Sequence, residues 1–77
     1  MSLELFYYPE CPYCRKVLQE IHKLGIEDRI ILKNINTSVQ DRQTLFHLNG
    51  RTQVPFLVID GEPMLESADI VIYLNNL

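Results

Sequence analysis

The fold is decided by residues 3–14, LELFYYPECPYC, where a run of strand-forming residues meets the start of a helical pattern. Enrichment in strand-forming residues favours a strand over Leu3–Tyr8, and Pro9 ends it because proline cannot donate to a ladder. Pro12 suits the first helical position, since its fixed φ is helical and the N–H that it lacks would be unpaired there. Two cysteines, Cys11 and Cys14, therefore lie where a helix begins.

The spacing of the cysteines indicates a redox centre. It places both sulfurs on the first helical turn, with Cys11 at its mouth and Cys14 one turn inside. Unpaired N–H groups and the positive end of the helix dipole stabilise a thiolate over a thiol at that position. We therefore expect Cys11 to be the nucleophile. Cys14, further in and less accessible, is expected to displace a mixed disulfide by forming the internal one.

Length and composition predict one small domain over residues 1–77, with a core supported by 47% hydrophobic residues. The net charge of −3 favours neither nucleic acid nor an anionic membrane as a partner. The chain lacks an apolar run long enough to span a membrane and a secretory leader, so a soluble cytoplasmic protein is expected. Cysteines only three positions apart restrain little unfolded-chain entropy, so a structural staple is the weaker interpretation. We expect a monomer.

The first half of the chain predicts a strand, a helix and a parallel strand. Apolar residues recur at helical spacing at Val17, Leu18, Ile21 and Leu24. A helix is therefore predicted from Pro12, with Gly25 as its C-terminal cap. The apolar block Arg29–Lys33 is predicted to be a buried strand, and a strand reached through a helix is expected to pair in parallel with the first.

The second half predicts a helix, a hairpin and a last helix. Ser38 followed by Asp41 resembles a capping box. The apolar residues of the helix that it opens, which ends before Gly50, are Val39, Leu45, Phe46 and Leu48. The run Phe56–Ile59 and the turn signal Asp60-Gly61 predict a hairpin whose second strand is Pro63-Met64-Leu65. Ser67 is predicted to cap the final helix.

This order of elements predicts an α/β domain with four strands and three helices. Open α/β sheets place their sites beyond the carboxyl ends of the parallel strands. The loop that holds Cys11 lies at such an end, so topology and motif agree.

Two other boundaries could line a groove near the thiols. A cis bond between Val54 and Pro55 would leave the Val54 backbone facing outward as a short edge to which a peptide-like ligand could pair, although most X-Pro bonds are trans. The Ser67 hydroxyl at a helix N-terminus suits a carboxylate, and Glu66 could pair with an ammonium group. The simpler alternative is that Ser67 only caps its helix and Glu66 is a solvated acid.

Together these residues resemble the glutaredoxins. Cys11-Pro12-Tyr13-Cys14 is similar to the dithiol motif of that family, and Gln53-Val54-Pro55 is similar to its cis-proline segment. The order of elements resembles the thioredoxin fold, with a four-stranded mixed sheet. Residues 66–70, ESADI, look closest to the glutaredoxin branch related to glutathione transferases.

The resemblance implies a glutathione-dependent thiol-disulfide oxidoreductase, with glutathione as co-substrate and disulfide-containing or glutathionylated proteins as partners. It implies that Glu66 and Ser67 hold the γ-glutamyl end of glutathione. Val54 would pair through its backbone with the cysteinyl part, and the adjoining Pro55 would also belong to the glutathione site. Gln53 would lie toward the glycyl end, and Tyr13 would form a wall of the groove.

One departure from the family concerns charge. Many glutaredoxins have a lysine shortly before the first cysteine, where this chain has Glu10. A negative neighbour disfavours a thiolate, so a cation would have to compensate. The candidates are Arg15, Lys16 and Arg51.

Other functions remain open. A thioredoxin-like reductant would need both thiols and no glutathione groove. A glutathione-binding or docking module derived from a transferase would make the thiols incidental, and alkylation of Cys11 that titrates like a free thiol would favour it. An iron-sulfur cluster ligated by Cys11 is disfavoured by Pro12. No metal is expected, because His22 and His47 are spaced unlike zinc ligands and are expected at the surface.

Overall fold

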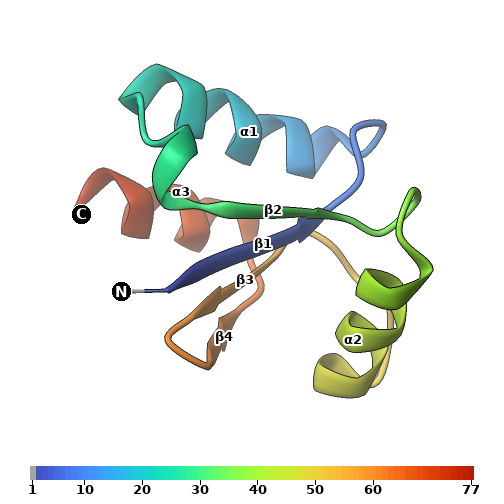
Figure 1. Ribbon diagram of the computed structural model, residues 1–77. Helices are drawn as coiled ribbons and strands as arrows, with labels where there is room; N and C mark the ends of the chain where they lie inside the picture. The colour runs from blue at the N-terminus through green and yellow to red at the C-terminus, as the bar shows by residue number, and fades with distance from the viewer. Residues whose placement is uncertain (1) are drawn as a thin grey trace.

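The computed structural model describes residues 2–77. The elements are β1 (Leu3–Tyr7), α1 (Pro12–Leu24), a 3-10 turn (Glu27–Arg29), β2 (Ile31–Asn34), α2 (Val39–Asn49), β3 (Phe56–Ile59), β4 (Glu62–Met64) and α3 (Ser67–Asn75). The four strands form one sheet in the order β2-β1-β3-β4 (Figure 1). β1 is parallel to β2 and antiparallel to β3, which is antiparallel to β4. The predicted thioredoxin-like fold, with three helices and a four-stranded mixed sheet, is confirmed.

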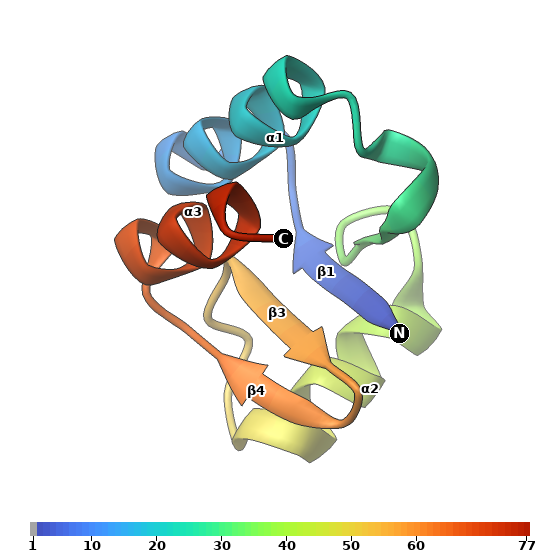
Figure 2. The same ribbon diagram turned by 90° about the vertical axis from the view of Figure 1, so that its left-hand side faces the viewer.

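The helices cover the two faces of the sheet unequally. α1 and α3 pack side by side on one face, and α2 lies on the other (Figures 1 and 2). The side chains of β1 alternate between these faces, as strand geometry requires. Leu3 and Leu5 join the core beneath α1 and α3, whereas Phe6 points to the core beneath α2. There its ring meets that of Phe56 edge to face, with ring centroids 6.0 Å apart.

The ends of α1 follow from its sequence. Pro12 is the first helical residue, as predicted, and Gly25 ends the helix with φ 67°. That left-handed conformation is unfavourable for a residue with a Cβ. The Gly25 N–H donates to the His22 carbonyl at 3.0 Å, so the last turn closes on itself.

The prediction of a buried strand over Arg29–Lys33 is wrong in two respects. Arg29 belongs to the 3-10 turn, and β2 begins at Ile31. β2 is also an edge strand, so Ile31 and Leu32 are 55% and 43% exposed. The strand still pairs in parallel with β1, as expected.

α2 is attached to the sheet by less apolar surface than its sequence suggests. Ser38 accepts a hydrogen bond from the Asp41 N–H at 3.1 Å, as predicted for the cap. The Ser38 N–H donates to the Asn34 carbonyl rather than to Asp41, so the reciprocal half of the capping box is not made. Of the apolar residues predicted for this helix, only Leu45 is buried, whereas Val39, Phe46 and Leu48 are exposed.

The hairpin between β3 and β4 turns at Asp60-Gly61, as predicted, and both residues have positive φ. β4 runs over Glu62–Met64, one residue earlier than expected. Within residues 2–77, the helices are all too short or too polar to cross a membrane.

Leu45→Ala is expected to lower the free energy of unfolding by about 3 kcal/mol, because a fully buried leucine on a poorly anchored helix leaves a cavity. The measurement is urea unfolding followed by circular dichroism. Val39→Ala on the same helix is the control, and it should change stability by less than about 0.5 kcal/mol because Val39 is 73% exposed. Equal costs for the two substitutions would contradict this account of α2.

Candidate active site

Cys11 and Cys14 lie on the first turn of α1. Cys11 is the N-cap, with an extended backbone at φ −75° and ψ 122°, and its carbonyl accepts the Arg15 N–H at 3.0 Å. No side chain caps this end of the helix. The orphan N–H groups and the positive end of the dipole are therefore directed at the region of the Cys11 thiol.

The two thiols differ in their surroundings. Cys14 is fully buried, whereas Cys11 keeps 6% of its surface exposed. Cys11 is thus more accessible than Cys14, as predicted. It is nevertheless less exposed than its position at the N-terminus of a helix suggests. The flanking residues Pro12 and Tyr13 are exposed instead.

Burial raises the pKa of the Cys14 thiol to about 12, against a backbone hydrogen bond with Tyr8 that lowers it. The Cys11 side chain raises the pKa of Cys14 further, through a hydrogen bond and through its charge. Cys14 therefore remains protonated at neutral pH and can donate to Cys11. This arrangement suits Cys14 to the role of the resolving thiol, which would react after Cys11.

The loop before Cys11 is held from both sides. Arg15 Nε donates to the Pro9 carbonyl at 3.0 Å, and Asn36 Nδ2 donates to Glu10 Oε1 at 3.5 Å. Within residues 2–77, no ion pair joins Glu10 to a cation. The three candidate cations, Arg15, Lys16 and Arg51, therefore form no ion pair with Glu10 in that part of the chain, and the Lys16 ammonium lies 5.8 Å from the centroid of the Tyr13 ring.

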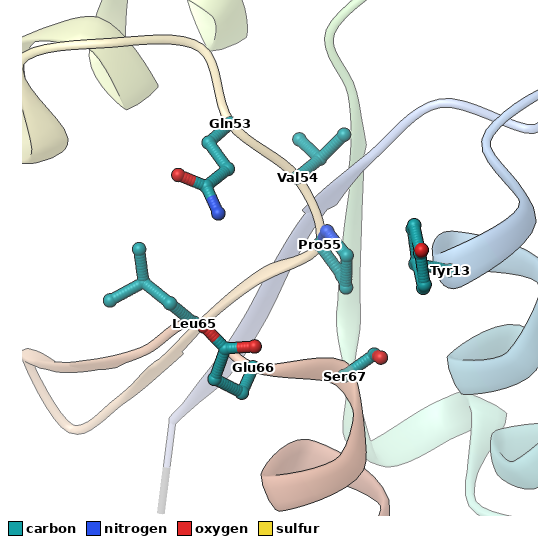
Figure 3. A pocket seen from close by; sticks show the side chains of 7 residues that line it. All are labelled: Tyr13, Gln53, Val54, Pro55, Leu65, Glu66 and Ser67. Atoms are coloured by element: carbon teal, nitrogen blue, oxygen red, sulfur yellow. The ribbon is translucent and has the colours of Figure 1, made fainter.

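A pocket of about 220 Å³ opens beside the first turn of α1 (Figure 3). The residues that line it are Tyr13, Gln53, Val54, Pro55, Leu65, Glu66 and Ser67. They come from the start of α1, the segment before β3 and the junction of β4 with α3, which are far apart in the sequence. The structure thus brings together all six residues predicted to contact glutathione. Leu65 is an addition that its position next to Glu66 could have suggested.

Two details of the pocket bear on the predictions. The Val54–Pro55 peptide bond is cis, as predicted. The prediction that Ser67 caps α3 is wrong, because Glu66 is the N-cap and its carbonyl accepts the Ile70 N–H at 2.9 Å. Ser67 is therefore the first helical residue. Its hydroxyl makes no hydrogen bond within residues 2–77, which leaves it available to a ligand at the N-terminus of α3.

The charges around the pocket suit a ligand that carries both signs. The uncapped N-terminus of α3 and the Ser67 hydroxyl are donors for a carboxylate. The Glu66 carboxylate lies on the same pocket and can accept from an ammonium group.

Within residues 2–77, the structure brings no three His, Cys, Asp or Glu side chains into a metal-binding group. His22 and His47 are both exposed, as expected. His22 Nδ1 lies 2.7 Å from Glu27 Oε2, at the end of α1 remote from the cysteines.

Iodoacetamide at neutral pH is expected to modify Cys11 in the folded protein and to leave Cys14 unmodified, because Cys14 is buried and its pKa is raised to about 12. Peptide mapping by mass spectrometry measures both sites. In Cys11→Ser the pKa of Cys14 should fall but stay raised, because burial, its largest cause, remains. Preferential labelling of Cys14 would contradict the assignment of the two thiols.

Comparison with known proteins places the chain among glutathione-related proteins. Residues 10–77 match the family described as glutathione S-transferase, N-terminal domain. Hybrid peroxiredoxin hyPrx5 from Haemophilus influenzae is 36% identical over 73 residues, which are 94% of this chain and 29% of that protein. The chain therefore spans less than a third of that relative.

Solved structures of similar fold belong to the same group of glutathione-related proteins. Glutaredoxin 2 from Salmonella typhimurium, in complex with glutathione, is 29% identical with a TM-score of 0.77, over 97% of this chain and 33% of that one. Glutathione S-transferase unclassified 2 from Bombyx mori is 26% identical with a TM-score of 0.81, over 99% of this chain and 35% of that one. Because the family match covers most of its length, the chain belongs to the glutathione S-transferase N-terminal domain family, with relatives among the glutaredoxins.

Proposed function

We propose that this domain is a glutathione-dependent thiol-disulfide oxidoreductase that reduces glutathione mixed disulfides and protein disulfides. The observation that carries the proposal is the placement of a thiol at the uncapped N-terminus of α1 beside a pocket with complementary polar groups. Tyr13 joins the two parts, because it stands between the cysteines in the sequence and forms one wall of the pocket.

The pocket suits glutathione group by group. The γ-glutamyl end carries a carboxylate and an ammonium on one carbon, which match Ser67 at the helix N-terminus and Glu66, respectively. In this proposal the Val54 backbone pairs with the cysteinyl residue, and Gln53 lies toward the glycyl end; both residues line the pocket. The complex of the related glutaredoxin 2 with glutathione supports this choice of ligand.

The reaction with a glutathione mixed disulfide needs only Cys11. The Cys11 thiolate attacks the glutathione sulfur, forms a Cys11–glutathione disulfide and releases the other thiolate, which takes up a proton. A second glutathione thiolate then attacks the bound glutathione sulfur. Glutathione disulfide leaves, and the Cys11 thiolate is restored.

Reduction of a protein disulfide would use Cys14 as well. Once Cys11 is joined to the substrate it carries no charge, so the part of the pKa shift of Cys14 caused by Cys11 is removed. The Cys14 thiolate can then attack the Cys11 sulfur, release the substrate thiolate and form the internal disulfide. Burial still opposes ionisation of Cys14, so we expect glutathione mixed disulfides to be the better substrates.

Cys11→Ser is expected to abolish turnover of a glutathione mixed disulfide, because it removes the attacking sulfur, whereas Cys14→Ser should retain it. The measurement is NADPH consumption with glutathione and glutathione reductase. Turnover that survives in Cys11→Ser would refute the proposal. Substituting thioredoxin and thioredoxin reductase for the glutathione system tests the thioredoxin-like alternative.

Ser67→Ala is expected to raise the KM for the glutathione mixed disulfide on the order of tenfold with little change in kcat, since a hydrogen bond to a charged group contributes about 1.5 to 3 kcal/mol. Asp69→Asn on the same turn of α3 is the matched control, because Asp69 does not line the pocket. Equal effects of the two substitutions would place the ligand elsewhere.

A second candidate is glutathione binding without redox turnover, which the 6% exposure of Cys11 favours. Isothermal titration with glutathione separates the two. Binding that is equal in the parent and in Cys11→Ser, together with no turnover by the parent, would establish the binding role.

A further inference from the structure

A second hollow, of about 300 Å³, adjoins the pocket. It runs between α1 and α3, which pack side by side on one face of the sheet (Figure 2). The residues that line this α1/α3 groove are Lys16, Ser67, Ala68, Val71 and Ile72. Apart from the Ser67 hydroxyl and the Lys16 ammonium, these side chains present aliphatic surface, because the stem of a lysine is itself a hydrocarbon chain.

The α1/α3 groove is continuous with the proposed glutathione pocket. Ser67 lines both hollows. Tyr13 lines the pocket, and the ammonium of Lys16, which lines the groove, lies 5.8 Å from the Tyr13 ring. Ile72 is 61% exposed, so apolar surface of the groove is open to solvent.

We propose that the α1/α3 groove binds an apolar side chain of the polypeptide whose mixed disulfide is reduced at Cys11, an inference that rests on the function proposed above. The glutathione half of such a substrate would fill the pocket. The polypeptide half must then leave Cys11 over another surface, and the groove is the apolar surface that adjoins the pocket.

The distance along α1 between Cys11 and the groove indicates which substrate residue can reach the groove. Lys16 lies five residues after Cys11, which is about 7.5 Å along the helix axis. Two residues of extended polypeptide span about 7 Å. The groove therefore selects an aliphatic side chain two positions from the substrate cysteine.

The bond changes are those of the mixed-disulfide reaction. The Cys11 thiolate bonds to the glutathione sulfur, the bond between glutathione and the peptide breaks, and the peptide leaves as a thiolate that takes up a proton. Glutathione remains the reductant. The groove contributes only to binding of the leaving peptide.

The test compares two glutathionylated pentapeptides, Leu-Gly-Cys-Gly-Leu and Ser-Gly-Cys-Gly-Ser, in the coupled glutathione reductase assay. The parent protein should reduce the leucine peptide with about a tenfold higher kcat/KM, the gain expected from burying one aliphatic side chain. In Ile72→Ser this ratio should fall toward one. Isoleucine and serine have similar helix propensities, so α3 should persist.

Val39→Ser is the matched control, since Val39 is an exposed aliphatic residue of α2, on the opposite face of the sheet. It should preserve the ratio of the parent. Equal rates for the two peptides in the parent, or an unchanged ratio in Ile72→Ser, would overturn the proposal. So would a parent dimer that Ile72→Ser dissociates in analytical ultracentrifugation, because a second copy would then occupy the groove.

The mixed disulfide of glutathione with 2-mercaptoethanol separates this proposal from the proposed function. This small substrate has no side chain to reach the groove. If the parent reduces it in a Cys11-dependent reaction but does not distinguish the peptides, the groove proposal fails alone. If the parent does not reduce it, the redox function fails.

Discussion

Packing of α1 and α3 on the same face of the sheet is the constraint on which the site depends. β1 is central, and its carboxyl end leads through the loop before Cys11 directly into α1. α3 enters from β4 and packs beside α1 over the core that contains Leu5 and Leu57. The N-termini of both helices consequently meet at one edge of the sheet. One terminus is occupied by a thiol, and the other adjoins a pocket.

In the proposed function, the two helix N-termini serve different electrostatic needs of one reaction. The N-terminus of α1 favours negative charge on sulfur, and that of α3 favours a carboxylate of the ligand. Glu66 adds the opposite charge beside α3. In the proposed function this charge would favour a zwitterionic group over a simple anion. The proposed function thus assigns binding and chemistry to separate elements, so KM and kcat are expected to change independently.

Much of this arrangement could be predicted from the sequence, because its signals are local. Proline after Cys11, glycine after Leu24 and the Asp60-Gly61 turn each specify a backbone conformation. The features that were missed depend on tertiary context. Whether Ile31 is buried depends on β2 being an edge strand, and the periodicity of a short apolar run does not reveal this.

The site residues also divide into those that local motifs reveal and those that depend on tertiary context. Six pocket residues could be named from motifs, but Leu65 carries no motif of its own, and the cap of α3 is decided by the extended backbone of Glu66 rather than by the nearby serine. Cys11 is less exposed than predicted, because the exposure of a side chain at a helix N-terminus depends on the neighbouring loops.

Glu10 and the N–H groups of α1 act on the region of Cys11 through different surroundings. Glu10 is exposed, and its carboxylate accepts a hydrogen bond from Asn36 at 3.5 Å. A unit charge in water acts on another at 4 Å with only about 1 kcal/mol, and salt screens it further. The N–H groups of α1 act instead on a sulfur that is almost covered, where the effective dielectric is lower and the same charge separation counts about fourfold more. Low exposure of Cys11 thus limits access to the sulfur while it strengthens the electrostatic interaction between the sulfur and the N-terminus of α1.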